Sequence, residues 1–181
     1  MTNYGGRQMA DSFRTVRTNT IALAEEIPAD KYDFRPAPDA RSVGEQLSHL
    51  AVSPRGQMAV HGAGLTSLDF AMFGKSMAEA AAAEQMLRSK DDIVAELREG
   101  GEEFASFLES LDETKLQEEV TFPPPVQPPT KSRFEMLLSV KEHEMHHRGQ
   151  LMMVQRMIGI VPHLTRRRQE MAAAAGGGDK A

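Results

Sequence analysis

The chain has 181 residues, enough for one domain with a full hydrophobic core, and a formal net charge of −5. The negative charge excludes the basic surface that is typical of nucleic-acid-binding proteins. The lack of cysteine excludes disulfides and any thiol chemistry of the chain's own. No segment approaches the roughly 20 apolar residues of a membrane span, and the N-terminus lacks the apolar run of a signal peptide. We therefore expect a cytoplasmic protein without membrane attachment.

Apolar residues recur every three or four positions from Arg7 to Ile27, which predicts a first helix that Pro28 closes. A proline-rich loop follows it. Ser42 is expected to cap the second helix, because Glu45 stands three residues later and completes a capping box. This second helix contains the sequence SVGEQLSHLAV.

The middle of the chain is less regular. Pro54 predicts either a kink in the second helix or the first turn of a new one. Residues 62–74 are rich in glycine and are expected to be irregular, with a turn or two of helix at most. Residues 78–87 are expected to form a helix, either within the fold or as a surface excursion. The third main helix is predicted from Asp91 to Leu111, with Ser89 or Asp91 as its cap.

The sequence TFPPPVQPPTKS is too rich in proline for a helix and predicts an extended connector. A fourth helix is expected to begin near residues 130–132 and to run to Ile158, where Gly159 stops it. No segment shows the alternation of a convincing strand. The fold class predicted is all-α, a four-helix bundle with one long crossover connection, spanning residues 1–170. Residues 171–181 are expected to be a disordered tail.

Three of the six histidines lie in the stretch VKEHEMHHRGQL of the fourth helix. His143 and His147 are one turn apart and project about 40° from each other. They share a sector with five apolar residues: Met136, Val140, Leu151, Val154 and Ile158. Two imidazoles without partners in such a stripe would each cost about 1–3 kcal/mol, so the pair predicts a metal ion.

A stable site needs a third protein ligand, and the residues alone leave three candidates: His49, His61 and His163. Periodicity places His49 at the border of the apolar face of the second helix, and the other two look like loop histidines. His146 points away from the pair and is expected at the edge of the site or in solvent.

The same stretch also satisfies the His-Glu-x-x-His pattern of zinc peptidases, in which Glu144 would activate a water molecule. The pattern is short, and the longer metzincin version would need glycine where Gln150 stands. The other interpretation of Glu144 is a surface carboxylate or a partner of a ligand. Gly149 in mid-helix suggests the close approach of another helix.

Two segments together, IPADKYDFRPAPDARSVGEQLSHLA and HEMHHRGQLMMVQRMIG, resemble the DinB family of small metal-binding bundle proteins. The resemblance covers about forty residues directly. It implies a four-helix bundle with a divalent metal, nickel or zinc, held by His49, His143 and His147. Gln150 and Glu144 are the candidates to orient a ligand or a bound water from outside this set.

Three neutral imidazoles leave a coordination position open for chemistry. The resemblance implies a metal-dependent thiol S-transferase or a related detoxification enzyme. Its partners would be an external low-molecular-weight thiol, such as mycothiol, bacillithiol or glutathione, and a small-molecule electrophile. The alternatives are a non-catalytic metal-binding protein of the stress response and a metallohydrolase that uses Glu144. Bundles of this type often pair through helix faces, so a homodimer is expected.

Overall fold

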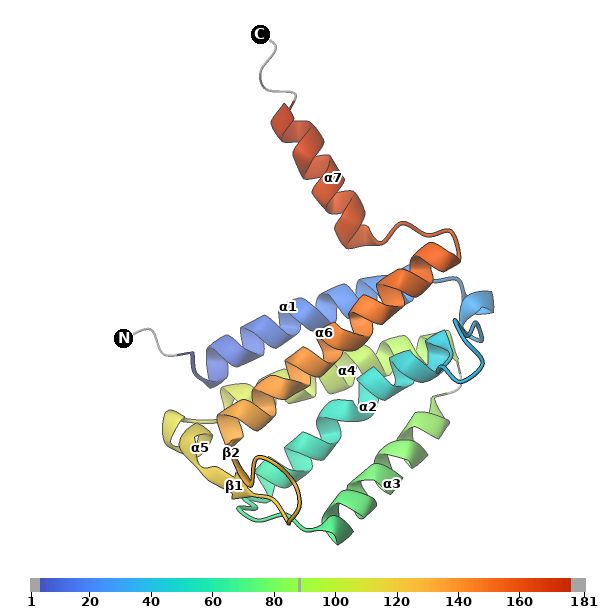
Figure 1. The fold of residues 1–181 in the computed structure, drawn as a ribbon. Coiled ribbons are helices and arrows are strands. Elements are labelled where there is room, and N and C mark those ends of the chain that lie inside the picture. The colour runs from blue at the N-terminus through green and yellow to red at the C-terminus, as the bar shows by residue number, and fades with distance from the viewer. Residues whose placement is uncertain (1–3, 88, 177–181) are drawn as a thin grey trace.

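The computed structural model describes residues 4–87 and 89–176. Four long helices form a bundle in which α1 and α2 each pack against both α4 and α6 (Figure 1). Their bounds are Gly6–Glu26 for α1, Val43–Gly62 for α2, Lys90–Glu109 for α4 and Arg133–Met157 for α6. The predicted four-helix bundle is thus confirmed.

Shorter elements connect the bundle helices. They are the 3₁₀ turn η1 (Ala29–Lys31), α3 (Phe70–Met86), α5 (Glu113–Gln117), β1 (Glu119–Thr121), β2 (Thr130–Ser132) and α7 (His163–Gly176). The long crossover connection contains α3, which packs on α2 and leads the chain back to the end of the bundle where α2 begins. As a result α2 and α4 run in the same direction (Figure 1). The α7 helix projects away from the bundle.

Three boundaries differ from the sequence-based expectations. The α3 helix begins at Phe70, inside the segment expected to be irregular, because Asp69 caps it by accepting from Met72 N at 2.8 Å. Two strands that were not expected lie at the two ends of the proline-rich connector, paired antiparallel with Thr121 opposite Thr130. The α7 helix continues to Gly176, into the range expected as a disordered tail, and residues 177–181 lie outside the described residues.

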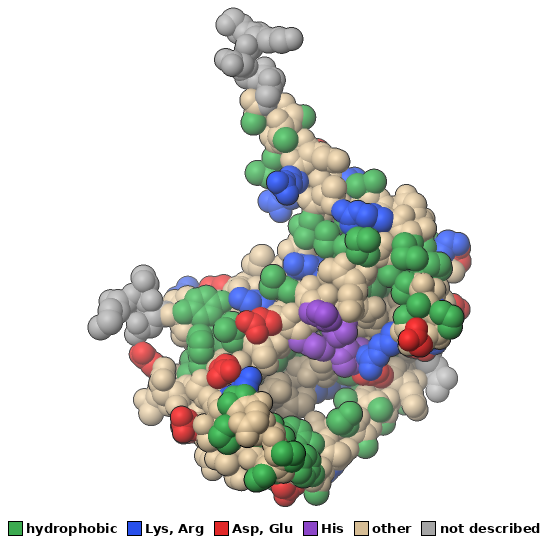
Figure 2. Space-filling model, viewed as in Figure 1, with side chains coloured by type: hydrophobic (Ala, Val, Ile, Leu, Met, Phe, Trp, Pro, Cys, Tyr) green, Lys and Arg blue, Asp and Glu red, His purple; other side chains and the backbone are tan. Residues whose placement is uncertain are grey.

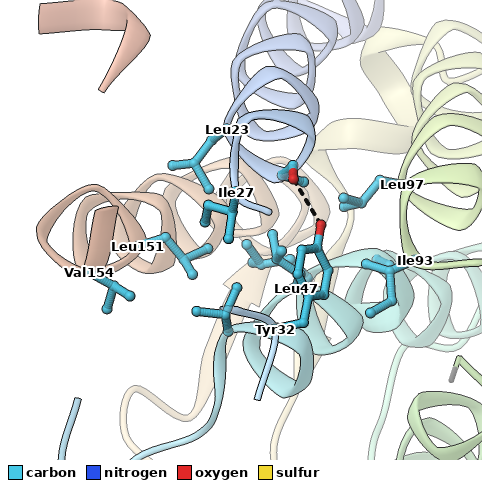
Figure 3. Packing of buried hydrophobic residues seen from close by; sticks show 12 residues of the cluster. Leu23, Ile27, Tyr32, Leu47, Ile93, Leu97, Leu151 and Val154 are labelled. Carbon is cyan, nitrogen blue, oxygen red and sulfur yellow. Dashed lines mark hydrogen bonds between the residues drawn. The ribbon is translucent and has the colours of Figure 1, made fainter. Parts of the chain in front are cut away.

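The core at the end of the bundle that carries η1 draws on all four long helices. Leucine, isoleucine and valine side chains from each helix meet there, and the Tyr32 hydroxyl donates to the Ala24 carbonyl at 2.8 Å (Figure 3). The labelled members are Leu23, Ile27, Leu47, Ile93, Leu97, Leu151 and Val154. This packing fixes the relative positions of α2 and α6, the two helices that carry the histidines.

Local signals set the ends of these two helices. Ser42 Oγ accepts from Glu45 N at 3.2 Å, and Glu45 Oε2 accepts from Ser42 N at 2.8 Å, as the capping box predicted. Ser132 caps α6, since its Oγ accepts from Glu135 N at 3.1 Å. After α6, Gly159 adopts a φ of 84°, which favours glycine and ends the helix.

Pro54 lies inside a continuous α2 rather than at the start of a new helix. Proline has no N–H, so the Leu50 carbonyl loses its helical partner. Arg17 supplies a donor in its place, with Nη2 3.0 Å from Leu50 O, and Ser53 Oγ donates to the same oxygen at 3.3 Å. The same guanidinium donates to Leu97 O at 3.2 Å and to Glu144 Oε2 at 3.0 Å. One buried arginine therefore joins all four helices of the bundle.

Among residues 4–87 and 89–176, no helix combines the length and the apolar character that crossing a bilayer requires.

Candidate metal site

Three histidines from two helices converge in the groove between α2 and α6. The Nε2 atom of His143 lies 3.1 Å from that of His49 and 3.1 Å from that of His147. One ring nitrogen of each residue lies within 4.8 Å of the other two. Ligands of a tetrahedral ion at about 2.0–2.1 Å would be roughly 3.3 Å apart, so the two separations from His143 are close to the spacing of ligands that share a cation. Figure 2 shows histidine side chains at the rim of a hollow on this face.

His49 is oriented by a carboxylate that sequence reasoning missed. Its Nδ1 lies 2.8 Å from Glu84 Oε1 of α3, and both side chains are about one-fifth exposed, 23% and 22%. A carboxylate oxygen only accepts, so Nδ1 carries the proton and the Nε2 lone pair is directed at the other histidines. Pairs of this kind hold the ring and raise its basicity as a ligand.

His147 is oriented by two amides. Gln46 Nε2 lies 3.1 Å from His147 Nδ1, but its two hydrogens are donated to Gln150 Oε1 at 2.7 Å and to the His147 carbonyl at 3.2 Å, which fixes the orientation of the Gln150 amide. Gln150 Oε1 in turn lies 2.9 Å from His147 Nδ1 and accepts its proton, so Nε2 of His147 is also unprotonated. Gln150 thus stands where its spacing from the histidine pair predicted. Gln46 gave no such signal in the sequence.

The donor set fits a cation better than it fits hydrogen bonding alone. The Nε2 lone pairs of His49 and His147 both face Nε2 of His143, which can carry at most one proton. That single proton would have to serve two acceptors, whereas a cation would satisfy all three lone pairs. Burial, and after it the nearby imidazoles of His147 and His49, together lower the pKa of His143 to about 4. Burial also lowers the pKa of His147. The rings of His143 and His147 are therefore neutral at pH 7, the state in which imidazole binds a metal.

Glu144 is neither at the surface nor hydrogen-bonded to an imidazole, which corrects both sequence-based expectations for it. Its side chain is 2% exposed and lies against Arg17, with Nη2 2.9 Å and Nε 3.0 Å from Oε2. Glu144 faces the bundle interior, where Arg17 donates to the Leu50 carbonyl that Pro54 leaves without a helical partner. The carboxylate of Glu144 supplies the opposite charge that a buried guanidinium requires. A carboxylate held in this way is not available to activate a water at the histidines.

The remaining histidines lie elsewhere. His61 is a buried residue of α2 that contacts Arg133 and Gln57, so it is not a loop residue as expected. His163 begins α7, with Nε2 3.2 Å from Asn19 Oδ1. His146 is exposed and accepts from Gln150 Nε2 at 3.1 Å. Its position at the edge of the site agrees with its direction on the helix.

Comparisons with known proteins agree with this architecture. A sequence model described as the DinB superfamily matches residues 12–151. The uncharacterized protein YjoA of Bacillus subtilis (strain 168) is 25% identical over 155 residues, 84% of this chain and 90% of YjoA. The crystal structure of YjoA, described as DinB-like, has a TM-score of 0.62 and covers 84% of this chain and 92% of that one.

A second solved structure, YfiT from Bacillus subtilis, has a TM-score of 0.69 at 14% identity and covers 88% of this chain and 91% of YfiT. It is described as a probable metal-dependent hydrolase with an unusual four-helix bundle topology. At this level of identity the likeness shows a shared fold.

Proposed function

This chain belongs to the DinB superfamily, and from that premise we propose that it is a divalent-metal enzyme that transfers an external low-molecular-weight thiol to a small electrophile. The observation that carries the proposal is the convergence of three Nε2 atoms, from His49, His143 and His147, on one point between two rigid helices. Nickel and zinc are the metals proposed, since imidazole suits both.

A bound divalent cation would lower the pKa of a coordinated thiol or water and so supply a nucleophile at neutral pH. The chain's own contribution is a set of neutral ligands. Three uncharged imidazoles leave the charge of the cation uncompensated, which favours an anionic fourth ligand such as a thiolate. Because the chain has no cysteine, the thiol has to come from outside.

The reaction proposed forms a bond between the thiol sulfur and a carbon of the electrophile. The leaving group departs with the electron pair of its bond to that carbon, and the thiol proton passes to solvent. Glu84 and Gln150 hold the imidazoles of His49 and His147 in the orientation that keeps their lone pairs together.

The test is the metal-dependent addition of glutathione, mycothiol or bacillithiol to monochlorobimane, which releases chloride and gives a fluorescent thioether. Protein purified without a histidine tag should be analysed for its metal and then assayed. His143→Ala should abolish both metal binding and turnover. His163→Ala is the matched control, because this histidine begins α7, away from the three converging nitrogens, with Nε2 3.2 Å from Asn19 Oδ1. Turnover that survives in His143→Ala would refute the proposal.

Hydrolysis is the second candidate, because YfiT is described as a probable metal-dependent hydrolase. In this chain such a reaction would proceed without Glu144 as its base, since that carboxylate is paired with Arg17. Metal-dependent cleavage of p-nitrophenyl acetate without thiol, unchanged in His163→Ala and lost in His143→Ala, would favour it. Metal binding with no turnover in either assay would leave a non-catalytic metal-binding protein.

A further inference from the structure

A cavity of about 380 Å³, open to solvent on one side, is bordered by α2, α3, α6 and the connection between β1 and β2. Ser53, one turn after His49 on α2, lines it, and so does Ser139, one turn before His143 on α6. Four helical residues rise about 6 Å, so the cavity starts within a small molecule's length of the three nitrogens.

The walls of the cavity are mostly apolar. They include Leu68, Met72, Phe73, Phe122 and Met136. The rings of the two phenylalanines are near parallel, 12° apart in plane, with centroids separated by 6.3 Å. Lys131 is the one charged side chain among the described lining residues, and Glu135 pairs with it at 3.1 Å. Volumes of about 300–1,000 Å³ are typical of small-molecule sites, and this lining favours an uncharged, apolar occupant.

One polar side chain is set in place at the cavity by buried groups that the metal site does not use. Arg133, fully buried, donates from Nη1 to His61 Nδ1 at 3.0 Å. An arginine only donates, so His61 carries its proton on Nε2 and donates it to Gln57 Oε1 at 3.1 Å. The Gln57 amide is thereby oriented with its oxygen towards His61, which leaves its NH₂ group to donate into the cavity.

The two hydrogen bonds of His61 require a neutral ring. Burial, and after it the charge of Arg133, lower the pKa of His61 to about 4, so the ring is neutral at pH 7. A buried histidine with both nitrogens committed has no capacity left for a metal. Its role in the structure is to fix Gln57.

We propose that this cavity binds the apolar, uncharged body of the substrate, and that Gln57 donates a hydrogen bond to a carbonyl or similar acceptor oxygen on it. The inference rests on the proposed function, since it gives the electrophile of that reaction a binding site beside the metal. The substrate class is then a neutral, ring-sized organic molecule that carries an oxygen acceptor and an electrophilic carbon.

The first test is direct binding, without thiol, of fluorescent tetramethylbimane, which has the bicyclic dione of monochlorobimane but no leaving group. Ser76→Phe introduces a ring at the cavity wall from α3, a helix in which no residue is buried, so the bundle should remain intact. We expect bimane affinity to fall at least about tenfold with zinc affinity unchanged. Ala78→Phe, exposed on the same helix, is the control and should bind as the wild type does.

The second test addresses Gln57. In Gln57→Glu the carboxylate still accepts from His61 but the donor is gone. Bimane should bind about three- to tenfold more weakly, whereas naphthalene, which has no acceptor, should bind equally well. A change that only disturbed the structure would weaken both ligands. Equal effects on the two would overturn the assignment of Gln57.

Wild-type protein that fails to bind bimane, or a Ser76→Phe protein that binds it unchanged, would overturn the cavity proposal. These binding measurements are independent of turnover. Binding through the cavity without any thiol transfer would refute the proposed function and leave the cavity assignment standing.

Discussion

Replacing Glu84 by alanine should weaken the binding of a divalent metal by about 10–100-fold, or about 1.4–2.7 kcal/mol. The carboxylate accepts from His49 Nδ1 at 2.8 Å and comes from α3, outside the two helices that carry the ligands. Without the carboxylate, the His49 ring can rotate and its proton can move from Nδ1 to Nε2. The Nε2 lone pair of His49 then no longer points at the other two ring nitrogens. Because both side chains are about one-fifth exposed, at 23% and 22%, solvent weakens the pair only in part.

The measurement is a competition titration of apo protein with zinc and a chromophoric chelator. Glu84→Gln keeps an acceptor oxygen without the charge and should lose less affinity than Glu84→Ala. Glu79→Ala is the matched control, since this exposed glutamate of α3 pairs with Lys75, at 3.8 Å, and not with a histidine of the site. A Glu84→Ala protein that binds zinc within twofold of the wild type would refute the view that α3 orients the ligand.

Three other predictions follow from the geometry. Zinc at about 100 times its Kd should stabilise the fold by about 2.7 kcal/mol and raise Tm by roughly 5–11 °C in a thermal-shift assay, and a His143→Ala protein that kept the shift would contradict the site. Arg17→Met should lower the free energy of unfolding in urea by about 3–5 kcal/mol, because it leaves Glu144 buried without its counter-charge, and Glu144→Gln in the same chain should recover part of the loss. In apo protein the pKa of His61 lies near 4, below the ordinary 6.5, so the unfolded chain takes up the proton first as pH falls. The contribution of His61 to stability is then complete above about pH 6.5 and should drop by about 2 kcal/mol by pH 5, and a His61→Gln protein with an equally steep pH profile would contradict this.

The parts of the fold that depend on local signals could be predicted from the sequence. The capping box of Ser42 and Glu45 forms as expected, and so does the end of α6 at Gly159. Apolar spacing gave the four long helices, and the one-turn spacing of His143 and His147 brought their rings together. Each of these signals acts within a few residues of chain, where helix geometry alone fixes the outcome.

The parts that depend on packing between helices could not be predicted in the same way. Periodicity left His49 at the border of an apolar face, because the site lies in a groove at the side of the bundle and not in its core. Glu84 reaches His49 from a segment separated from it by a glycine-rich stretch, with no local pattern to connect them. Gly149 has nothing within 4 Å of an added Cβ, so the close helix approach expected there was wrong.

Glu144 shows why a short motif misleads. The His-Glu-x-x-His pattern fixes which side chains share a face, but it says nothing of what faces them from other helices. Here Pro54 leaves the Leu50 carbonyl without its helical donor, and Arg17 donates to that carbonyl. The same arginine donates to Glu144, which holds the carboxylate away from the histidines. This sequence of contacts joins residues 17, 50, 54 and 144, which no local analysis would bring together.

The α3 helix contributes no buried residue, yet it supplies both the acceptor for His49 and one wall of the cavity. Folding stability therefore comes from the other long helices, while much of the shape offered to a ligand comes from this one. Substitutions along its inner surface should be tolerated at little thermodynamic cost. A library randomised at Met72, Phe73 and Ser76 would accordingly be a practical route to new ligand preferences on an unaltered scaffold.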